Sequence, residues 1–410
     1  MMKYILLVIF HCSFLICMAA PMHVETDRSW YLAGEAMTVS VTDDEARIAY
    51  AELCDTHSLA VGVVIGLKGG TGKGVIELPA NLHSGYYMLS AYTRHNTEVS
   101  QRLIAVVNPL RKSANDDIEW VESDYSQAEK SAEDLSAPLL TREGQGGGAA
   151  PEKEGHIIKA RVKNVYDGNT FTASQICPSL SIVGKQIHYF EGKMVDDSTA
   201  VFYTYGIQGR LPLVLSALTS TGESLPIEMI SPFAALLQKE LPHLVFHYKR
   251  SEVEARSLDM QRHQQAILPP SSFLVPPSSF TLLGTQPDLS YNLDEYRQFL
   301  TVREVLLEYV SCVTDRRING ALKLIVRKEQ EVYNSSLPTL VLIDGMPVND
   351  TERLLNYDAR RVHYINIYAG QYTFGTGVYN GILSFVTRSG QLTNYPTEPN
   401  MQYLVYDFPE

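Results

Sequence analysis

The chain has 410 residues, 45% of them hydrophobic and 20% charged. These fractions are those of an ordinary globular protein and exclude an intrinsically disordered chain; the length predicts about two to three domains. The formal net charge of -12 argues against nucleic acid or an anionic membrane surface as the main partner, because both need a cationic footprint.

The first twenty residues have the pattern of an export signal. Lys3 precedes apolar runs over residues 4–10 and 14–18, and small residues suited to cleavage follow at 19–20. An uncleaved anchor is the alternative, but an interrupted run of about seventeen residues is short for a membrane span. Lipidation at Cys17 is also left open. We predict a signal peptide over residues 1–20, an exported protein, and no transmembrane segment after its removal.

Three cysteines remain in the mature chain, Cys54, Cys177 and Cys312. An exported protein built on disulfides would carry an even, clustered set. We therefore predict small buried thiols and domains that depend on their own hydrophobic cores. None of these cysteines has His or Cys neighbours at ligand spacing, and we predict no metal site and no cofactor.

Short strands are predicted through residues 21–109, which indicates an antiparallel β-sandwich. Residues 26–35 follow the pattern T-D-x-x-x-Y-x-x-G-E, and residues 76–89 follow I-x-L-P-x-x-x-x-x-G-Y-Y-x-L. This order resembles the second macroglobulin domain of the alpha-2-macroglobulin family, over nearly the whole predicted domain.

A glycine-rich run over residues 66–74 superficially suggests a phosphate-binding loop. The P-loop needs glycine five residues before its Gly-Lys pair and Ser or Thr after the lysine, where this chain has Leu67 and Gly74. No helix is predicted to follow it, so we expect a connection between strands.

An acidic, glycine-containing stretch over residues 110–155 carries few apolar residues. Such a composition predicts a mobile linker, with an acidic interaction segment as the alternative.

A second β-sandwich is predicted over residues 156–250, from alternation within 158–163 and 201–205. His243 and His247 lie four residues apart, as two zinc ligands on a helix do. The intervening sequence is strand-like, and a strand would hold the two side chains about 13 Å apart. We therefore interpret both histidines as structural. A connector over residues 251–290 follows, with a helix through residue 265 and then a proline-rich spacer.

The last predicted domain covers residues 291–410. Thr301 and Glu304 have capping-box spacing, and apolar residues on one helical face follow as far as residue 310. Strands are predicted over 321–326, 340–343, 362–368 and 382–387. The pair Asp344-Gly345 is a strong turn signal.

The same domain carries a second resemblance. Residues 340–348 are L-V-L-I-D-G-M-P-V, and residues 378–390 are V-Y-N-G-I-L-S-F-V-T-R-S-G. With the capped helix before them, they resemble the plug domain of TonB-dependent outer-membrane receptors. The combination is similar to Bacteroidetes-type exported proteins that join a macroglobulin-type domain to a plug-like domain without the barrel. It implies a periplasmic or outer-membrane-associated location and an envelope protein as partner.

The departures from both families limit the function. A plugged barrel of about 22 strands needs hundreds more residues, and the thioester motif of the macroglobulins is absent. The sequence shows no nucleophile elbow, metal cluster or paired-carboxylate motif. Asp344 is a conceivable catalytic acid, but an aspartate that bonds its own turn is the preferred interpretation. We name no catalytic, cofactor-binding or metal residue.

The predicted fold class is mainly β: two tandem antiparallel β-sandwich domains followed by a small α+β plug-like domain. The preferred function is that of an exported, non-enzymatic binding or scaffold protein of the cell envelope, with a plug-like domain that docks on another envelope component. The alternatives are an envelope-polymer hydrolase with an unrecognised site and a protease-inhibitor-like macroglobulin fragment. The identity of any small-molecule ligand and the oligomeric state stay open.

Overall fold

The computed structural model describes residues 22–94, 98–109, 111–122, 140–141, 155–184, 186–266, 281–282, 285–318, 320–327, 337–374, 377–390, 392, 395 and 398–409. The fold is mainly β and most strand pairs are antiparallel, which confirms the predicted fold class. The chain forms two compact units. Unit 1 comprises Met1–Pro151 and Leu237–Arg250, and unit 2 comprises Glu152–Leu236 and Ser251–Glu410.

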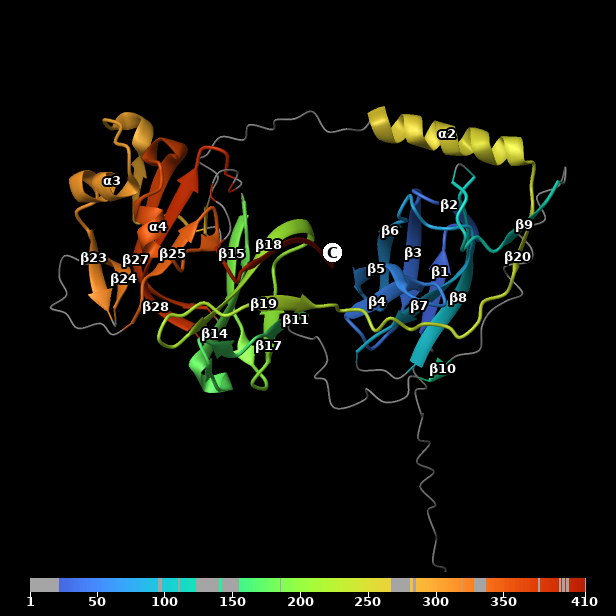
Figure 1. Cartoon of the computed structure of the whole chain (residues 1–410), viewed down its shortest axis with the longest axis horizontal. Helices are drawn as coiled ribbons and strands as arrows, with labels where there is room; N and C mark the ends of the chain where they lie inside the picture. Colours follow the sequence, from blue (N-terminus) through green and yellow to red (C-terminus); the bar gives the residue numbers. More distant parts are fainter. Residues whose placement is uncertain are drawn as a thin grey trace, which may run out of the picture. The chain divides into compact units, whose positions relative to one another are not determined.

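Unit 1 is a β-sandwich, drawn mainly in blue and cyan in Figure 1. The smaller sheet has the order β1–β3–β6 and consists of β1 (His23–Thr26), β3 (Ala36–Thr42) and β6 (Thr71–Glu77). The larger sheet has the order β10–β8–β7–β4–β5, with β2 paired to β8, and consists of β2 (Trp30–Leu32), β4 (Ile48–Cys54), β5 (Leu59–Gly66), β7 (Gly85–Tyr92), β8 (Glu98–Val107) and β10 (Leu140–Thr141).

Alternation of apolar residues produces the core of this sandwich. Met37, Val39 and Val41 of β3 point into it, because successive side chains of a strand face opposite sides. Ala51 and Leu53 of β4 meet them from the larger sheet. The glycine-rich run ends β5 and begins β6, so its role as a connection between strands is confirmed.

Two further strands of unit 1 differ from the expected organisation. β9 (Ile118–Val121) lies in the predicted linker and pairs in parallel with β20 (Leu244–His247), which we had assigned to the second sandwich. The reason is aromatic packing: the ring of Phe246 lies 5.1 Å from that of Trp30 and 5.4 Å from that of Trp120. Residues 123–139 and 142–154 of that linker lie outside the described residues.

Unit 2 contains the second predicted sandwich, most of whose strands are coloured green in Figure 1. One sheet has the order β16–β17–β11–β19 and consists of β11 (His156–Val162), β16 (Lys193–Met194), β17 (Thr199–Thr204) and β19 (Ile227–Ile230). The other has the order β21–β15–β14–β18–β29 and consists of β14 (Ile176–Ile182), β15 (Gln186–Glu191), β18 (Gly209–Thr219), β21 (Thr281–Leu282) and β29 (Gln402–Phe408). A small hairpin joins β12 (Val165–Tyr166) to β13 (Asn169–Thr170), and the 3-10 helix η1 (Ala173–Gln175) follows.

The C-terminal region of unit 2, orange to red in Figure 1, is built on a five-stranded sheet of order β22–β27–β28–β25–β26. Its strands are β22 (Leu289–Asn292), β25 (Leu340–Ile343), β26 (Met346–Pro347), β27 (Val362–Phe374) and β28 (Gly377–Thr387). Around it lie α3 (Val302–Tyr309), α4 (Thr351–Leu355), the 3-10 helices η3 (Leu293–Glu295) and η4 (Ala359–Arg361), and the hairpin of β23 (Val313–Ile318) and β24 (Ala321–Val326). The predicted connector helix is observed as α2 (Arg250–Ala266).

The strand β29 belongs to the second sandwich, although we expected residues 291–410 to form one domain. It pairs with β18 from Gly209↔Phe408 to Leu215↔Gln402. In Figure 1 the dark red strand beside β18 is this segment. Tyr406 and Phe408 are buried among the apolar side chains of the sandwich core, and this burial explains the pairing.

A second contact joins the C-terminal region to this sandwich at the Asp344-Gly345 turn. The N–H of Gly184, after β14, donates to the carbonyl oxygen of Asp344 at 3.0 Å. Gly345 has a φ of 93°, and a Cβ at that position would lie 2.6 Å from the carbonyl oxygen of Ile182. The turn therefore needs glycine both for its backbone angle and for its closeness to β14.

Among the residues that the structure describes, no helix has both the length and the apolar composition that a membrane span requires.

Candidate binding surface

Asp344, the acidic residue that the sequence singled out, is fully buried at 0% exposure. We expected it to bond the backbone of its own turn, but its carboxylate accepts hydrogen bonds from the last residue of β28 and from the segment that follows. Oδ1 accepts from the N–H of Thr387 at 2.7 Å, and Oδ2 accepts from the Thr387 hydroxyl at 2.5 Å and from the N–H of Leu392 at 3.0 Å. Asp344 has a positive φ of 47°, which few residues other than glycine adopt readily. Burial raises the pKa of this carboxyl, although these hydrogen bonds act in the opposite direction.

Glu398 has a similar position in the C-terminal region. It is buried, and its carboxylate accepts hydrogen bonds from the N–H groups of Asn349 and Asp350 at 3.0–3.2 Å. Burial raises its pKa, the largest of several effects. Both buried carboxylates thus fix loops, and their oxygens point at backbone donors.

The two histidines with ligand spacing lie at strand β20, as the sequence predicted. The imidazole of His243 contacts the carboxylate of Asp117, and its Nε2 lies 3.9 Å from Oε2 of Glu119. Within the described residues, no group of three or more His, Cys, Asp or Glu side chains is arranged to hold a metal ion.

The three cysteines are free thiols in different environments. Cys54 is buried, as predicted, and burial raises its pKa to about 12. Cys177 is exposed and Cys312 half-buried, so the prediction of buried thiols was wrong for these two. Cys177 lies near the start of β14 at a position whose side chain points outward.

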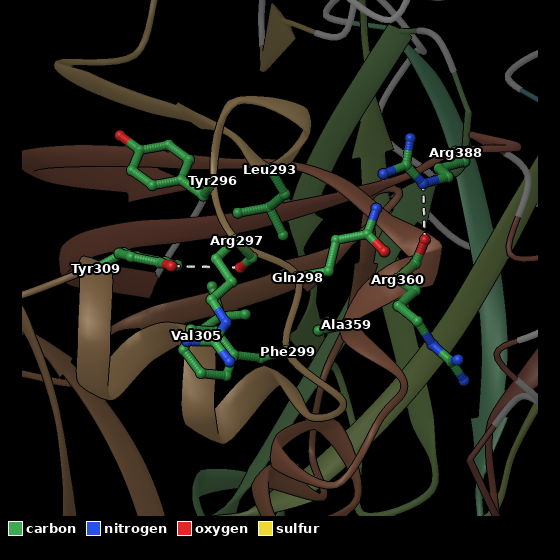
Figure 2. A pocket seen from close by; sticks show the side chains of 10 residues that line it. All are labelled: Leu293, Tyr296, Arg297, Gln298, Phe299, Val305, Tyr309, Ala359, Arg360 and Arg388. Carbon is green, nitrogen blue, oxygen red and sulfur yellow. Dashed lines mark hydrogen bonds between the residues drawn. The ribbon is translucent and has the colours of Figure 1, made fainter.

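The described surface has a shallow depression in the C-terminal region, open to solvent and shown in Figure 2. We call it the arginine hollow. It is formed by η3 and the segment after it, α3, η4 and the residue after β28, and its lining residues are Leu293, Tyr296, Arg297, Gln298, Phe299, Val305, Tyr309, Ala359, Arg360 and Arg388.

Aromatic side chains form one side of the arginine hollow. Figure 2 shows Tyr296 and Tyr309 on the side opposite Arg360 and Arg388. The ring centroid of Tyr309 lies 4.6 Å from that of Tyr296 and 5.5 Å from that of Phe299. The hydroxyl of Tyr309 donates to the carbonyl oxygen of Arg297 at 3.3 Å, which fixes the segment against α3.

Hydrogen bonds to fixed acceptors hold the arginines on the other side. Nε of Arg388 donates to the carbonyl oxygen of Arg360 at 2.7 Å, and its Nη2 donates to Asp294 at 2.6 Å. The guanidinium of Arg360 binds Asp358 in a bidentate manner, at 2.8 and 2.9 Å. Bidentate pairs of this kind restrict orientation as well as adding attraction. The positions of both arginines are therefore defined.

The carboxylate of Asp294 lies between two cationic or protonatable groups. One oxygen accepts from Arg388, and the other lies 3.0 Å from Nε2 of His363. The Arg388 hydrogen bond holds the pKa of Asp294 below its usual range. Burial lowers the pKa of His363, although Asp294 acts in the opposite direction.

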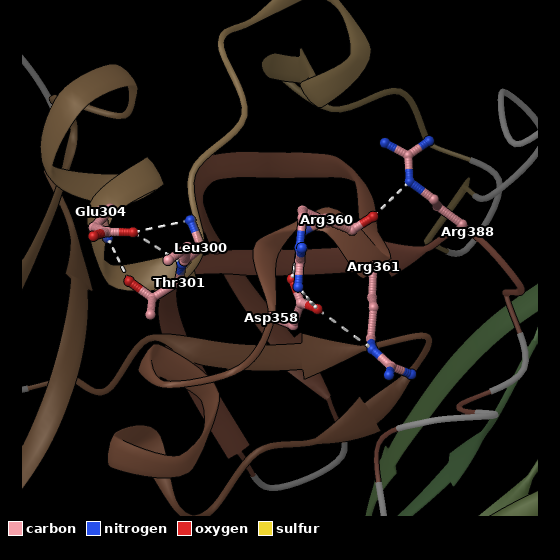
Figure 3. A network of polar contacts seen from close by, with 7 residues as sticks. All are labelled: Leu300, Thr301, Glu304, Asp358, Arg360, Arg361 and Arg388. Carbon is pink, nitrogen blue, oxygen red and sulfur yellow. Dashed lines mark hydrogen bonds and ion pairs between the residues drawn. The ribbon is translucent and has the colours of Figure 1, made fainter.

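The first turn of α3 is fixed by the predicted capping box, shown in Figure 3. The hydroxyl of Thr301 accepts from the N–H of Glu304, whose Oε2 accepts from the N–H groups of Leu300 and Thr301 at 3.0 Å. Figure 3 also shows Asp358 between Arg360 and Arg361, the second of which lies 3.7 Å from it. These bonds fix the start of α3 and the start of η4, and both elements contribute residues to the hollow.

Sequence reasoning did not identify this hollow. Its arginines come from three separate segments, and none belongs to a recognised motif. One signal was available: Arg360-Arg361 followed by His363 is a local basic cluster in an acidic chain.

No family model matches the chain, and no curated protein matches it. Similar solved structures include Escherichia coli alpha-2-macroglobulin activated by porcine elastase, at 12% identity and a TM-score of 0.19, covering 51% of this chain and 19% of that chain. A Salmonella alpha-2-macroglobulin mutant has the same identity and TM-score, with coverages of 51% and 14%. Native E. coli alpha-2-macroglobulin has 12% identity and a TM-score of 0.20, with coverages of 52% and 14%. The chain thus spans a small part of the length of these bacterial proteins.

Proposed function

We propose that the chain is an exported, non-enzymatic binding or scaffold protein of the cell envelope, and that its C-terminal region docks on another envelope component through the arginine hollow. The export signal pattern over residues 1–20 and the sequence resemblance to receptor plugs support the location, in the periplasm or at the outer membrane. That resemblance also connects the docking with outer-membrane transport.

The observation that carries the proposal is the composition of the hollow. Tyrosine and arginine are, with tryptophan, the residue types most enriched among those that dominate binding energy at protein interfaces. Here they lie together around one depression, with Tyr296 36% exposed and Arg297 exposed. The hydrogen bonds of Tyr309, Arg360 and Arg388 hold the surface before a partner arrives, which lowers the entropy lost on binding.

The buried carboxylates are consistent with a non-enzymatic role. Asp344 and Glu398 have raised pKa values, a property found at many catalytic acids. Neither of them lines the arginine hollow, and each is bound to backbone N–H groups that close a loop. We therefore propose a structural role for both.

In-cell photo-crosslinking tests the proposal. Tyr296 is replaced by a photo-crosslinking phenylalanine analogue, and after irradiation of intact cells the crosslinked neighbour is identified by mass spectrometry. The matched control places the same analogue at Tyr403 of β29, which is 46% exposed and lies in the second sandwich.

A specific envelope protein captured from position 296 and not from 403 is the expected result. Capture of nothing at position 296, or of the same proteins at both positions, would contradict the docking surface.

A further inference from the structure

We infer that the arginine hollow binds an acidic segment of its partner protein, with carboxylates paired to Arg297 and Arg388 and an apolar side chain packed against Tyr296 and Tyr309. The inference rests on the proposed docking function and specifies the chemistry of the partner.

The first argument is charge. Four arginines, Arg297, Arg360, Arg361 and Arg388, lie in or beside the hollow, while the acidic groups paired with them are Asp294 and Asp358. Asp358 is shared by two arginines, and Asp294 is shared by Arg388 and His363. The surface therefore has an excess of positive charge on a chain whose formal net charge is -12.

The second argument is the unused donors. Among the contacts of the described residues, the guanidinium of Arg297 makes no hydrogen bond or ion pair, and Nη1 of Arg388 makes none. A guanidinium has five N–H donors in a planar fork whose geometry matches a carboxylate. Because Nε and Nη2 of Arg388 are held by the carbonyl of Arg360 and by Asp294, its free edge has a defined direction.

The third argument distinguishes a protein segment from a lipid headgroup. The aromatic side of the hollow gives an apolar side chain a surface beside the arginines, and Tyr296 and Tyr309 already contact each other there. An anionic membrane would present phosphates over a wide plane and repel the acidic remainder of the chain. A short acidic segment, by contrast, would bring its negative charge only to the arginines, while its one apolar residue packs against the tyrosines.

Fluorescence anisotropy with the purified full chain tests this chemistry. The probe is a fluorescein-labelled peptide with the sequence Gly-Glu-Glu-Phe-Glu-Glu-Gly, and its matched control has Gln in place of each Glu. Vesicles of phosphatidylglycerol and inorganic phosphate are titrated as competitors. The variants are Arg297→Gln and Arg388→Gln, and the control variant is Arg161→Gln, an exposed position on β11.

The acidic probe should bind more tightly than its Gln counterpart, and more weakly as salt concentration rises, because salt screens exposed charges. Arg297→Gln should weaken binding by about threefold or more, the range of a solvent-accessible ion pair. Arg161→Gln should leave the affinity unchanged. The guanidinium of Arg297 makes no hydrogen bond or ion pair with the described residues, so Arg297→Gln should unfold at the same temperature as wild type. An unchanged midpoint would show that weaker binding by this variant does not result from a damaged fold.

Equal affinity for both peptides, no effect of Arg297→Gln, or displacement of the probe by the vesicles would overturn the inference. These outcomes are separate from failure of the docking function. A specific crosslink at position 296 without preference for the acidic probe would retain docking and reject the acidic chemistry, whereas no crosslink would reject docking itself.

Discussion

Asp344 shows how one buried residue connects two distant segments of the chain, one through its carboxylate and one through its backbone carbonyl. Its oxygens accept from Thr387 and Leu392 while its carbonyl oxygen accepts from the N–H of Gly184 in the neighbouring sandwich. A buried acceptor with three donors is costly to remove, because the donors lose their partner without regaining water.

Asp344→Ala should lower the free energy of unfolding by about 1–3 kcal/mol, the cost of leaving buried N–H groups unsatisfied. Alanine is also disfavoured at the positive φ of this residue. Asp344→Asn should cost less, since asparagine keeps an acceptor and tolerates this backbone angle. Urea unfolding of the three proteins measures the order, and an alanine variant as stable as the asparagine variant would contradict it.

The difference in stability between wild type and Asp344→Asn should depend on pH. Burial raises the folded-state pKa of Asp344 above its unfolded value, so the folded state holds the proton more tightly. This contribution to stability is fully present below about pH 4, the unfolded pKa, and is lost as the pH rises through the folded pKa. Wild type should therefore lose stability relative to Asp344→Asn as the pH is raised above about 4, and an unchanged difference would contradict the sign.

At the scale of single elements, α3 is the part of the C-terminal region that the sequence determines most directly. Thr301 and Glu304 satisfy the first free N–H groups, and Val302, Val305 and Leu306 face the core. All of this information is local, so the helix was predictable from residue spacing.

Thr301→Ala should reduce stability by about 1 kcal/mol, the usual value of an N-cap hydroxyl. Thr301→Ser keeps the hydroxyl and is the matched control. Hydrogen exchange of the first turn of α3, read beside urea unfolding, should show faster exchange in the alanine variant alone. Equal protection in both variants would mean that packing, and not the cap, fixes this end of the helix.

Other elements escaped prediction because their signal is not local. β23 carries Asp315, Arg316 and Arg317, which point to solvent and give no apolar alternation. β9 lies within an acidic stretch and is recognisable only beside β20, its partner far along the chain. The arginine hollow could not be predicted for the same reason. The order of strands in the sheet brings η3, η4 and the end of β28 together, and no residue spacing in the sequence encodes that order.

At the scale of the whole molecule, the sandwich and the C-terminal region of unit 2 share a sheet and several side-chain contacts, so we expect them to unfold as one cooperative structure. The sandwich takes its edge strand β29 from the end of the C-terminal region, and a further apolar cluster joins β15 to the C-terminal sheet. That cluster includes Tyr189, Leu342 and Tyr368. The hydroxyl of Tyr379 in β28 donates to Glu191 of β15 at 2.8 Å.

Phe408→Ala tests this cooperativity. Phe408 is 2% exposed and belongs to the sandwich core, so its truncation should cost about 3–5 kcal/mol. The loss should lower the unfolding midpoint of the C-terminal region together with that of the sandwich. Val405→Ala, at a position of the same strand that is 52% exposed, should change stability by about 0.5 kcal/mol or less. Separate unfolding of the C-terminal region at its original midpoint would contradict the prediction.

The position of β29 in the chain also sets the order of events during synthesis. The ribosome delivers β14 and β18 first, then the C-terminal region, and only afterwards the strand that pairs with β18. Until that moment the growing chain exposes an unpaired strand edge and an apolar core without Tyr406 and Phe408. Pairing between strands that are far apart in the sequence, such as β18 and β29, forms slowly. We therefore expect nascent unit 2 to expose this apolar edge to aggregation, or to a chaperone, until β29 has been synthesised.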